Sequence, residues 1–282
     1  MRKRAAIIAA AAAVPVVAAS AVAVVAKIAR RRHDRKLRGE YSYPSMFGDA
    51  EVFTMETDDG TPVRVLYVGG GFQSATYLGR DRFKPVFEYY RAFDHMFEAG
   101  IDIDRVLMLG GGGFSYPKHL LKSQDDVAID VVELDPAILD IARKHFFVDE
   151  LEAEHGDGGT GRLGIYVQDG LDFLRETPDA RYDVVINDSF DGANPTVGLL
   201  TSTALLEAKR TLRPGGLYLL NAVVGEGDDD RLRTFMEIML EGFDNVYAIS
   251  CFDEEFAGEE NWLIVGTDVS YCFSGVGAML SR

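Results

Sequence analysis

Cysteine is scarce in this chain, whose 282 residues include only Cys251 and Cys272. Two thiols at that spacing match neither a disulfide framework nor a cysteine-ligated metal site. The five histidines are equally isolated, because no two of them have the helical or turn spacing of a metal-ligand pair. We therefore expect no metal cofactor.

Basic residues are scarce beyond residue 40. Residues 1–40 hold ten of the 29 lysines and arginines and two of the 45 acidic residues, so residues 41–282 carry 19 basic and 43 acidic side chains. Nucleic-acid-binding proteins usually meet phosphates with clustered Lys and Arg. The acidic body therefore argues against nucleic acid as a partner and suits a small cationic ligand better.

One long apolar run lies near the amino terminus. Residues 5–26 form 22 uncharged residues, close to the ~20 that a membrane-spanning helix needs. The run leads directly into the basic segment 27–38, which favours an uncleaved anchor over the alternative, a cleaved signal peptide. Seven basic residues follow the run and three precede it, which predicts a membrane-anchored protein with the rest of the chain in the cytoplasm.

The rest of the chain predicts a small β-subdomain followed by an α/β domain. Residues 49–78 alternate apolar and polar positions around Asp59-Gly60, as a β-hairpin does, and residues 84–99 have an apolar helical face. Beyond them, strands are expected at 105–109, 128–134, 163–167, 182–187, 215–223, 245–250 and 261–267, and helices at 136–146, 170–177, 201–212 and 228–241. This alternation predicts a Rossmann-like, doubly wound, mainly parallel sheet.

Three regions follow from this organisation. We expect an anchor with its basic segment at 1–40, a β-hairpin subdomain at 41–83 and the Rossmann-like domain at 84–282. In doubly wound sheets, ligands bind beyond the carboxyl ends of the strands, where the strand order switches. The functional residues are therefore sought directly after each expected strand.

A glycine-rich loop follows the first of these strands. In VLMLGGGGFSYP, residues 106–117, a buried strand runs into Gly110, Gly111 and Gly112 and then into a helix. Glycine lets the backbone approach a ligand closely, and a helix start offers unpaired N–H donors. The loop alone is consistent with either a cofactor site or a plain turn.

Acidic residues end the next three strands. Glu133 can accept hydrogen bonds from ribose hydroxyls, Asp169 can meet the amino group of an adenine, and Asp188 ends the fourth strand. Together with the glycine loop they predict a nucleoside-bearing cofactor. NAD fits less well than S-adenosylmethionine or a relative, because Ser115 occupies the place of the third glycine in G-x-G-x-x-G and no second pyrophosphate-binding half follows.

The motifs resemble those of the spermidine synthase family, aminopropyltransferases built on the class I S-adenosylmethionine-dependent methyltransferase fold. The resemblance covers about residues 49–268 and is carried by FQS (72–74), EYYRAF (88–93), VLMLGGGG (106–113), VVELDP (131–136), VQDG (167–170), NDSFDG (187–192) and TLRPGG (211–216). It implies that the donor, decarboxylated S-adenosylmethionine, is bound by Gly110, Gly111, Gly112, Glu133, Asp169 and Gly170. Members of the family commonly pair, so it also implies a homodimer.

The resemblance assigns the amine substrate to a second set of residues. Asp188 and Asp191 match two loop aspartates that hold the amine and help to remove its proton, and Gln73 with Tyr89 or Tyr90 matches positions that line the polyamine channel. The chemistry is consistent with this assignment. A sulfonium is a good leaving group, so the reaction needs an uncharged amine held in line with the carbon that it attacks. Asp188 is the candidate base and Asp191 its electrostatic partner.

Several positions depart from the family. Gly113 replaces an aspartate that contacts the aminopropyl amine, Gly192 replaces a proline, residues 221–223 read NAV where the family tends to have Gln-Gly-Glu, and the late loop tyrosine is matched at best by Phe256. An aspartate at position 113 would repel the carboxylate of intact S-adenosylmethionine. Glycine at this position therefore favours intact S-adenosylmethionine over its decarboxylated form as the donor. Three interpretations stay open: an aminopropyltransferase, a methyltransferase of unknown acceptor, and a non-catalytic nucleoside- or polyamine-binding protein.

Overall fold

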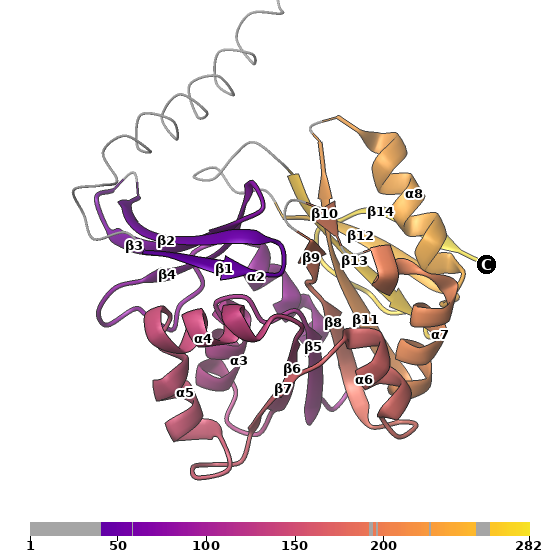
Figure 1. Cartoon of the computed structure of the whole chain (residues 1–282). Helices are drawn as coiled ribbons and strands as arrows, with labels where there is room; N and C mark the ends of the chain where they lie inside the picture. Colours follow the sequence, from indigo (N-terminus) through magenta and orange to yellow (C-terminus); the bar gives the residue numbers. More distant parts are fainter. Residues whose placement is uncertain (1–40, 58, 192–193, 196, 226, 252–259) are drawn as a thin grey trace, which may run out of the picture. The chain divides into compact units, whose positions relative to one another are not determined.

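A sheet of eight strands forms the centre of the part of the chain that the structure describes (Figure 1). The structure is a computed structural model that describes residues 41–57, 59–191, 194–195, 197–225, 227–251 and 260–282. The strands are β5 (Arg105–Leu109), β6 (Ala128–Glu133), β7 (Leu163–Val167), β8 (Tyr182–Asn187), β11 (Leu212–Val224), β12 (Asn245–Cys251), β13 (Glu260–Thr267) and β14 (Val276–Ser281). Their order is β14-β12-β13-β11-β8-β5-β6-β7.

The sheet is parallel from β7 to β11 and antiparallel beyond it. β5 pairs with β6 on one side and with β8 on the other, so the strand order switches between β5 and β8. The expected doubly wound, mainly parallel sheet is therefore confirmed. The glycine-rich loop follows β5, one of the two strands between which the strand order switches.

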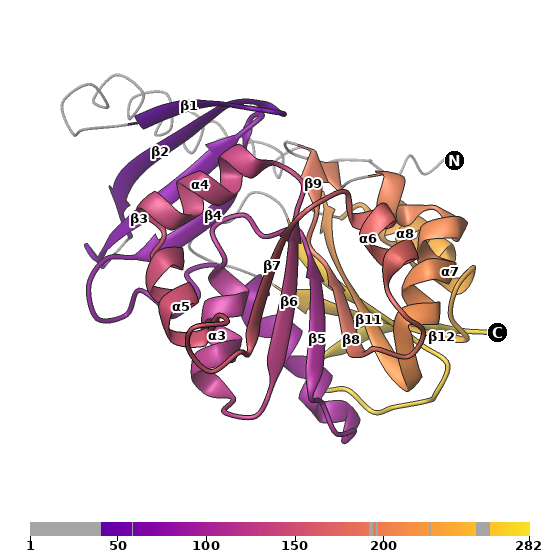
Figure 2. The ribbon, with the colours of Figure 1, turned by 60° about the horizontal axis from the view of Figure 1, so that its bottom comes forward.

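Helices cover both faces of the sheet, as Figure 2 shows. They are α3 (Ser115–Ser123), α4 (Pro136–His145) and α5 (Val148–His155) on one face, and α6 (Gly170–Glu176), α7 (Ser202–Thr211) and α8 (Asp229–Leu240) on the other. The alternation along β5 explains both layers, because Val106 and Met108 point into the first core and Leu107 and Leu109 into the second. Four consecutive apolar residues, as at 106–109, are typical of a strand in a sheet that is buried on both sides.

The β-subdomain is a four-stranded antiparallel sheet of β1 (Tyr41–Ser45), β2 (Gly48–Glu56), β3 (Pro62–Val68) and β4 (Gly71–Tyr77). The expected hairpin between β2 and β3 is confirmed. Gly60 adopts φ +84°, and the Asp59 carboxylate accepts the Thr61 N–H at 2.9 Å, so both residues of the Asp-Gly turn serve its geometry. One face of this sheet packs on Ile138, Ile141 and Phe146 in and after α4.

The segment expected to be one helix over 84–99 is shorter and tighter than predicted. It consists of α2 (Tyr89–Ala92) followed by the 3₁₀ helix η2 (Phe93–Ala99). Pro85 forms an isolated antiparallel bridge with Thr76 of β4, so the chain is still extended where the helix was expected to begin. β14, α5 and the two-residue strands β9 (Phe190–Asp191) and β10 (Asn194–Pro195) were not predicted.

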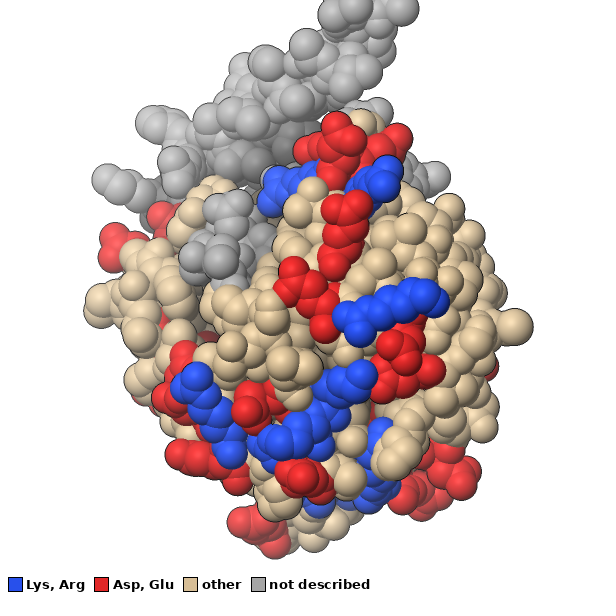
Figure 3. Space-filling model, turned by 90° about the vertical axis from the view of Figure 1, so that its right-hand side faces the viewer, with Lys and Arg blue, Asp and Glu red and all other residues tan. Residues whose placement is uncertain are grey.

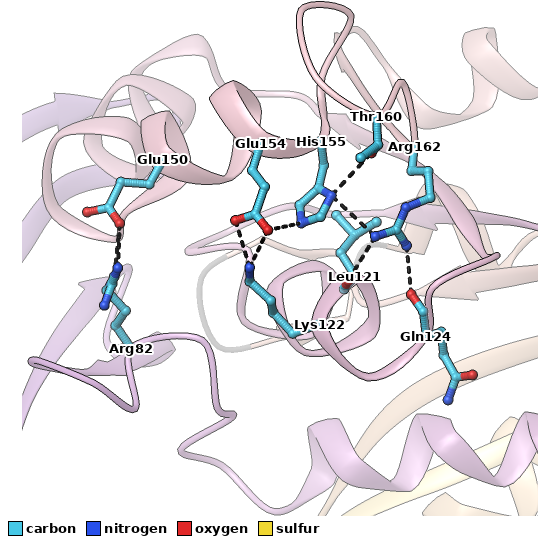
Figure 4. A network of polar contacts seen from close by, with 9 residues as sticks. All are labelled: Arg82, Leu121, Lys122, Gln124, Glu150, Glu154, His155, Thr160 and Arg162. Carbon is cyan, nitrogen blue, oxygen red and sulfur yellow. Dashed lines mark hydrogen bonds and ion pairs between the residues drawn. The ribbon is translucent and has the colours of Figure 1, made fainter.

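Arg162, which directly precedes β7, ties neighbouring elements together (Figure 4). Its guanidinium donates to the carbonyls of Leu121 and Gln124 at the end of α3, at 3.1 and 2.6 Å, and to Nδ1 of the buried His155 at 3.3 Å. Carbonyls at a helix end have no partner within the helix, so Arg162 supplies the missing donors. Figure 4 also shows the ion pairs Arg82–Glu150 and Lys122–Glu154.

Charges of both signs alternate on the side of the molecule that carries α7 and α8 (Figure 3). Ion pairs there include Lys209–Asp268, Arg210–Glu207 and Arg233–Glu237. These pairs place opposite charges next to each other on this face.

The predicted membrane anchor, residues 5–26, lies outside the described residues. Within the residues that the structure does describe, none of the helices has both the length and the apolarity to cross a membrane. The proposed regions 41–83 and 84–282 belong to one unit by their contacts, Tyr41–Arg282.

Candidate active site

Four neighbouring parallel strands bring the candidate residues to one edge of the sheet. Gly110 follows β5, Glu133 is the last residue of β6, Asp169 follows β7 after one residue, and Asp188 follows β8 directly. The register aligns these ends, because Leu109 pairs with both Val132 and Asn187 and Glu133 pairs with Val167. The carboxyl ends of parallel strands meet at the same edge, so three acidic side chains and the glycine loop share this edge.

The glycine loop presses against the end of β8. Gly110 adopts φ +94°, and a Cβ atom added to it would lie 2.3 Å from the carbonyl oxygen of Asp188. The Asp188 N–H donates to the Leu109 carbonyl at 2.9 Å, and the Gly110 N–H donates to the Val132 carbonyl at 2.9 Å. Position 110 therefore requires glycine for its backbone angle and for the contact. The backbone at Leu109 and Gly110 is therefore in direct contact with the backbone of Asp188.

The Glu133 side chain holds the glycine loop through hydrogen bonds to its backbone. Its Oε2 accepts the N–H groups of Gly111 and Gly112 at 2.9 and 3.0 Å, and its Oε1 accepts the Asp135 N–H at 3.0 Å. Burial raises the pKa of this carboxyl, and the three N–H donors oppose that rise. A carboxylate has about four acceptor positions, so three protein donors leave room for one more. The sequence pointed to Glu133 as a ribose acceptor and missed its role in holding the loop.

Asp169 caps the helix that follows it. Its Oδ1 accepts the N–H groups of Leu171 and Asp172 at 2.9 and 3.1 Å, which satisfies two donors in the first turn of α6. The side chain is exposed, and the cap uses only one of its two oxygens. Gly170 is the first residue of α6, where a Cβ would approach Leu199 Cδ1 to 3.2 Å. Asp169 is thus fixed in place with Oδ2 turned away from the cap bonds.

Asp188 is half-buried and has an amide partner. Asn221 of β11 donates from Nδ2 to Oδ1 of Asp188 at 2.7 Å, and Asn261 of β13 donates to the Asn221 Oδ1 at 2.8 Å. Burial raises the pKa of Asp188 to about 7, against the opposing effect of the Asn221 hydrogen bond. A carboxyl group that titrates near neutrality can accept a proton and release it at physiological pH.

Two tyrosines of α2 lie next to Asp188. The ring centroids of Tyr89 and Tyr90 are 4.1 Å apart, and the Tyr90 hydroxyl donates to the backbone carbonyl of Gln73 at 3.4 Å. Burial and then the negative charge of Asp188 raise the pKa of both phenols, so both stay neutral. The structure therefore brings Tyr89, Tyr90 and the backbone of Gln73 to the same site as Asp188 and the loop.

The β-subdomain is joined to the start of α3 by buried polar contacts. Ser115 Oγ donates to the Ala75 carbonyl at 2.9 Å and lies 3.0 Å from Ser74 Oγ. Lys118, which is fully buried, donates to Thr76 Oγ1 at 3.1 Å and to the Phe146 carbonyl at 3.2 Å, and burial lowers its pKa to about 7. These bonds hold β4, and with it Gln73, against the glycine loop.

Gly113 has no room for a side chain. A Cβ atom there would lie 2.7 Å from Ser74 Oγ and 2.9 Å from Phe146 Cδ1. An aspartate at this position would require both neighbours to move, so Ser74 and Phe146 explain the glycine that the sequence shows. Ser74, Asn221 and Asn261 were not predicted as site residues. The only feature of the sequence that could have indicated two of them is their place in short motifs, since Ser74 is the last residue of FQS and Asn221 is the first residue of NAV.

Asp191 is described only by its backbone. It belongs to β9, where it pairs with Asn194 of β10, and its side chain lies outside the described part of the structure. Its role as a partner of Asp188 stays a prediction, as does the family comparison at Phe256, which is also outside. Among the described residues, no group of three or more His, Cys, Asp or Glu side chains could hold a metal ion.

The sequence is similar to proteins of a known family. The model of the spermine/spermidine synthase domain matches residues 87–228, which is half of the chain. A polyamine aminopropyltransferase of Prochlorococcus marinus (strain NATL1A) is 27% identical over 169 residues, covering 56% of this chain and 57% of that protein. The chain spans about half the length of the first curated relatives it matches.

Solved structures show the same fold. A probable spermidine synthase from Corynebacterium glutamicum has a TM-score of 0.65 at 22% identity, over 82% of this chain and 81% of that one. A spermidine synthase in complex with the transition-state analogue AdoDATO has a TM-score of 0.63 at 19% identity, over 80% of this chain and 72% of that one. The expected class I methyltransferase-like fold with an amino-terminal antiparallel sheet is thereby confirmed.

Proposed function

Because the chain belongs to the spermine/spermidine synthase family, we propose that it is an aminopropyltransferase that moves an aminopropyl group from decarboxylated S-adenosylmethionine to a di- or polyamine. One observation carries the proposal. Asp188, whose pKa burial raises to about 7, stands at the end of β8 against the backbone of the glycine loop. A proton acceptor therefore lies where an acceptor amine and a nucleoside donor would meet.

The proposed reaction needs no covalent enzyme intermediate. The amine nitrogen attacks the carbon next to the sulfonium, the C–S bond breaks, and its electron pair neutralises the sulfur. The attacking nitrogen becomes positively charged and releases its proton to the Asp188 carboxylate. An amine is protonated near neutral pH, so orienting an uncharged nitrogen in line with the carbon is the main task of the protein. Asp191 is the proposed electrostatic partner for a second ammonium group.

The donor site is proposed at the other three strand ends. Gly110, Gly111 and Gly112 form the loop along which the donor lies, the free acceptor position of Glu133 meets a ribose hydroxyl, and Asp169 Oδ2 receives the adenine amino group. The observed cap of Asp169 and the loop bonds of Glu133 support these roles, because both carboxylates are already oriented before a ligand binds. Gly170 lets the nucleoside approach the start of α6.

The proposed acceptor site is the aromatic wall of α2. Tyr89 and Tyr90 are neutral and lie next to Asp188, so they can contact the carbon chain and the ammonium groups of a polyamine. Gln73, whose backbone carbonyl accepts the Tyr90 hydroxyl, is the proposed polar residue of this acceptor site.

Mass spectrometry of the products tests the proposal directly. The purified full chain is incubated with decarboxylated S-adenosylmethionine and a panel of diamines and polyamines, and the mass added to the amine identifies the transferred group. Transfer of an aminopropyl group that Asp188→Asn slows by about 10²- to 10⁴-fold is the expected result. If the substitution leaves the transfer rate within about tenfold of wild type, Asp188 is not the base.

Methyl transfer from intact S-adenosylmethionine is the second candidate. Its support is the packing at Gly113, where Ser74 and Phe146 exclude the acidic side chain that would anchor an aminopropyl amine and repel a carboxylate. A product that gains a methyl group identifies this activity. Binding of either donor without turnover identifies the remaining candidate, a nucleoside- or polyamine-binding protein.

We also propose a cellular placement and an assembly from the sequence. Residues 5–26 anchor the chain in a membrane, residues 27–38 lie on the cytoplasmic side with the catalytic body, and two chains pair as in other family members. Fractionation of cells tests the anchor, because the full chain is expected with membranes and a chain beginning at residue 41 is expected without them. Light scattering after size-exclusion chromatography tests the pairing.

A further inference from the structure

Two asparagines stand in a row behind Asp188. Asn221 of β11 is 3% exposed and touches the carboxylate, whereas Asn261 of β13 touches only Asn221 among the described polar contacts of this row. β11 and β13 are antiparallel with Val223 opposite Asn261, so Asn221 and Asn261 are diagonal neighbours on one face of the sheet. The row therefore extends from the site into the sheet.

The direction of each hydrogen bond in the row is determined by chemistry. An ionised carboxylate only accepts hydrogen bonds, so Asn221 must present its NH₂ group to Asp188 and its carbonyl oxygen to the other side. A buried amide oxygen requires a donor of its own, and the NH₂ group of Asn261 supplies it. If Asn221 were reversed, its oxygen would face Asp188, and only a protonated carboxyl group could then donate to it.

We propose that Asn261 is a positioning residue that sets the proton affinity of Asp188 without touching it, by fixing the orientation of the Asn221 amide. This inference rests on the proposed function only for its consequence in catalysis, since the orientation itself is a property of the protein alone. It assigns the late strand β13 a role in the site.

The other groups around the row do not take over this role. Tyr89 and Tyr90 face Asp188 from α2, and both phenols are held neutral. The glycine loop faces Asp188 with backbone atoms of Gly110. Of the described titratable groups on the elements next to Asn261, Cys251 of β12 is opposite it in the sheet, and the charge of Glu88 before α2 acts on Cys251. The side chain of Glu260, which precedes Asn261 on β13, is not described. The side chain of Asp191 is not described.

The substitution Asn261→Asp tests the proposal with almost no change in shape. Asn221 would then lie between two carboxyl groups that both need its single NH₂ group. One of them must keep a proton to donate to the amide oxygen, so Asp188 and the new carboxyl share a proton to higher pH. The apparent pKa of Asp188 is expected to rise by about one pH unit, a tenfold change in proton affinity.

The measurement is a ¹³C NMR titration of the aspartate carboxyl groups in the ligand-free full chain, with the Asp188 signal assigned by its loss in Asp188→Asn. Asn245→Asp is the matched control, because it makes the same chemical change at the other end of the neighbouring strand β12. It is expected to leave the Asp188 titration unchanged. Asn261→Leu, which removes the donor without adding an acid, is a second variant and is expected to shift the titration upward by a smaller amount.

Several outcomes separate the two proposals. An unchanged or lowered Asp188 titration in folded Asn261→Asp and Asn261→Leu overturns the role of Asn261, whatever the activity. If the titration rises and the low-pH limb of kcat/KM for aminopropyl transfer rises with it, both proposals are supported. If the titration rises but none of the donors is turned over by the wild-type chain, the role of Asn261 stands and the proposed function fails.

Discussion

Replacing Asp188 by asparagine is expected to stabilise the protein at alkaline pH while it slows the proposed transfer. In the folded protein, burial raises the pKa of Asp188 from 3.8 to about 7. The folded state therefore binds the Asp188 proton more tightly than the unfolded state. The stability that this proton contributes is complete below pH 3.8 and is lost as the pH rises through 7, because folding must then bury an ionised carboxylate.

The size of the effect follows from the same shift. A rise of about three pH units corresponds to about 4 kcal/mol of unfolding free energy, and we expect about 2 kcal/mol because Asp188 is only half-buried and solvent screens its charge. Asparagine has nearly the same shape, carries no charge and can still accept the Asn221 hydrogen bond through its amide oxygen. The substitution therefore removes the cost of the buried charge and leaves no cavity.

Urea denaturation at several pH values is the appropriate assay. The difference in unfolding free energy between Asp188→Asn and wild type is expected to grow by about 1–2 kcal/mol between pH 5 and pH 8. Asp172→Asn is the control, since Asp172 is an exposed acid in the first turn of α6, paired with Arg175 at 3.1 Å. Its effect is expected to stay within about 0.5 kcal/mol.

A difference that does not change with pH, or a variant that is less stable than wild type at pH 8, would refute this reasoning. Either result would mean that the folded protein accommodates the ionised Asp188 without cost. Transfer by the same variant is expected to fall by about 10²- to 10⁴-fold, the usual contribution of a general base. A gain in stability together with a loss of activity is typical of a strained catalytic group.

Three further substitutions test other parts of the structure. Gly110→Ala is expected to destabilise the protein by about 3 kcal/mol, measured by urea denaturation, because the new methyl group would meet the Asp188 carbonyl at a φ that disfavours alanine. Arg162→Ala leaves carbonyls at the end of α3 without donors and is expected to cost about 2 kcal/mol by the same assay. Burial lowers the pKa of His145 from 6.5 to about 4, so the stability that neutral His145 contributes should be lost as the pH falls from 6.5 to about 4. Wild type should therefore lose stability relative to His145→Gln over this range in thermal unfolding.

Much of the fold could be predicted because its signals are local. The alternation of core positions along β5, the Asp-Gly turn between β2 and β3 and the capping acid Asp135 before α4 each act within a few residues. The longest of the strands that were not predicted, β14, is mostly exposed, and its sequence VGAMLS has no clear alternation of apolar and polar residues. Helix α2 was placed too early because the bridge between Pro85 and Thr76 is a tertiary contact.

The candidate site was predicted in outline because strand ends converge in any doubly wound sheet. Its finer polar contacts could not be predicted, since Asn221 and Asn261 are 40 residues apart and meet only through the register of β11 and β13. The reason for glycine at position 113 could not be predicted either, because Ser74, whose side chain occupies the space beside it, comes from the other sheet. Sequence periodicity reports which face a residue occupies and does not report which distant residue it meets.

The contact between Gly110 and the Asp188 carbonyl has a consequence for how this site can diverge. At this contact, backbone atoms set the spacing between the glycine loop and the end of β8 that carries Asp188. Under the proposed function, replacing side chains on either side of the contact would alter which molecules are accepted and leave this backbone spacing unchanged. Such a scaffold could exchange substrates through a series of single mutations, each of which keeps the geometry that the proposed displacement at carbon requires.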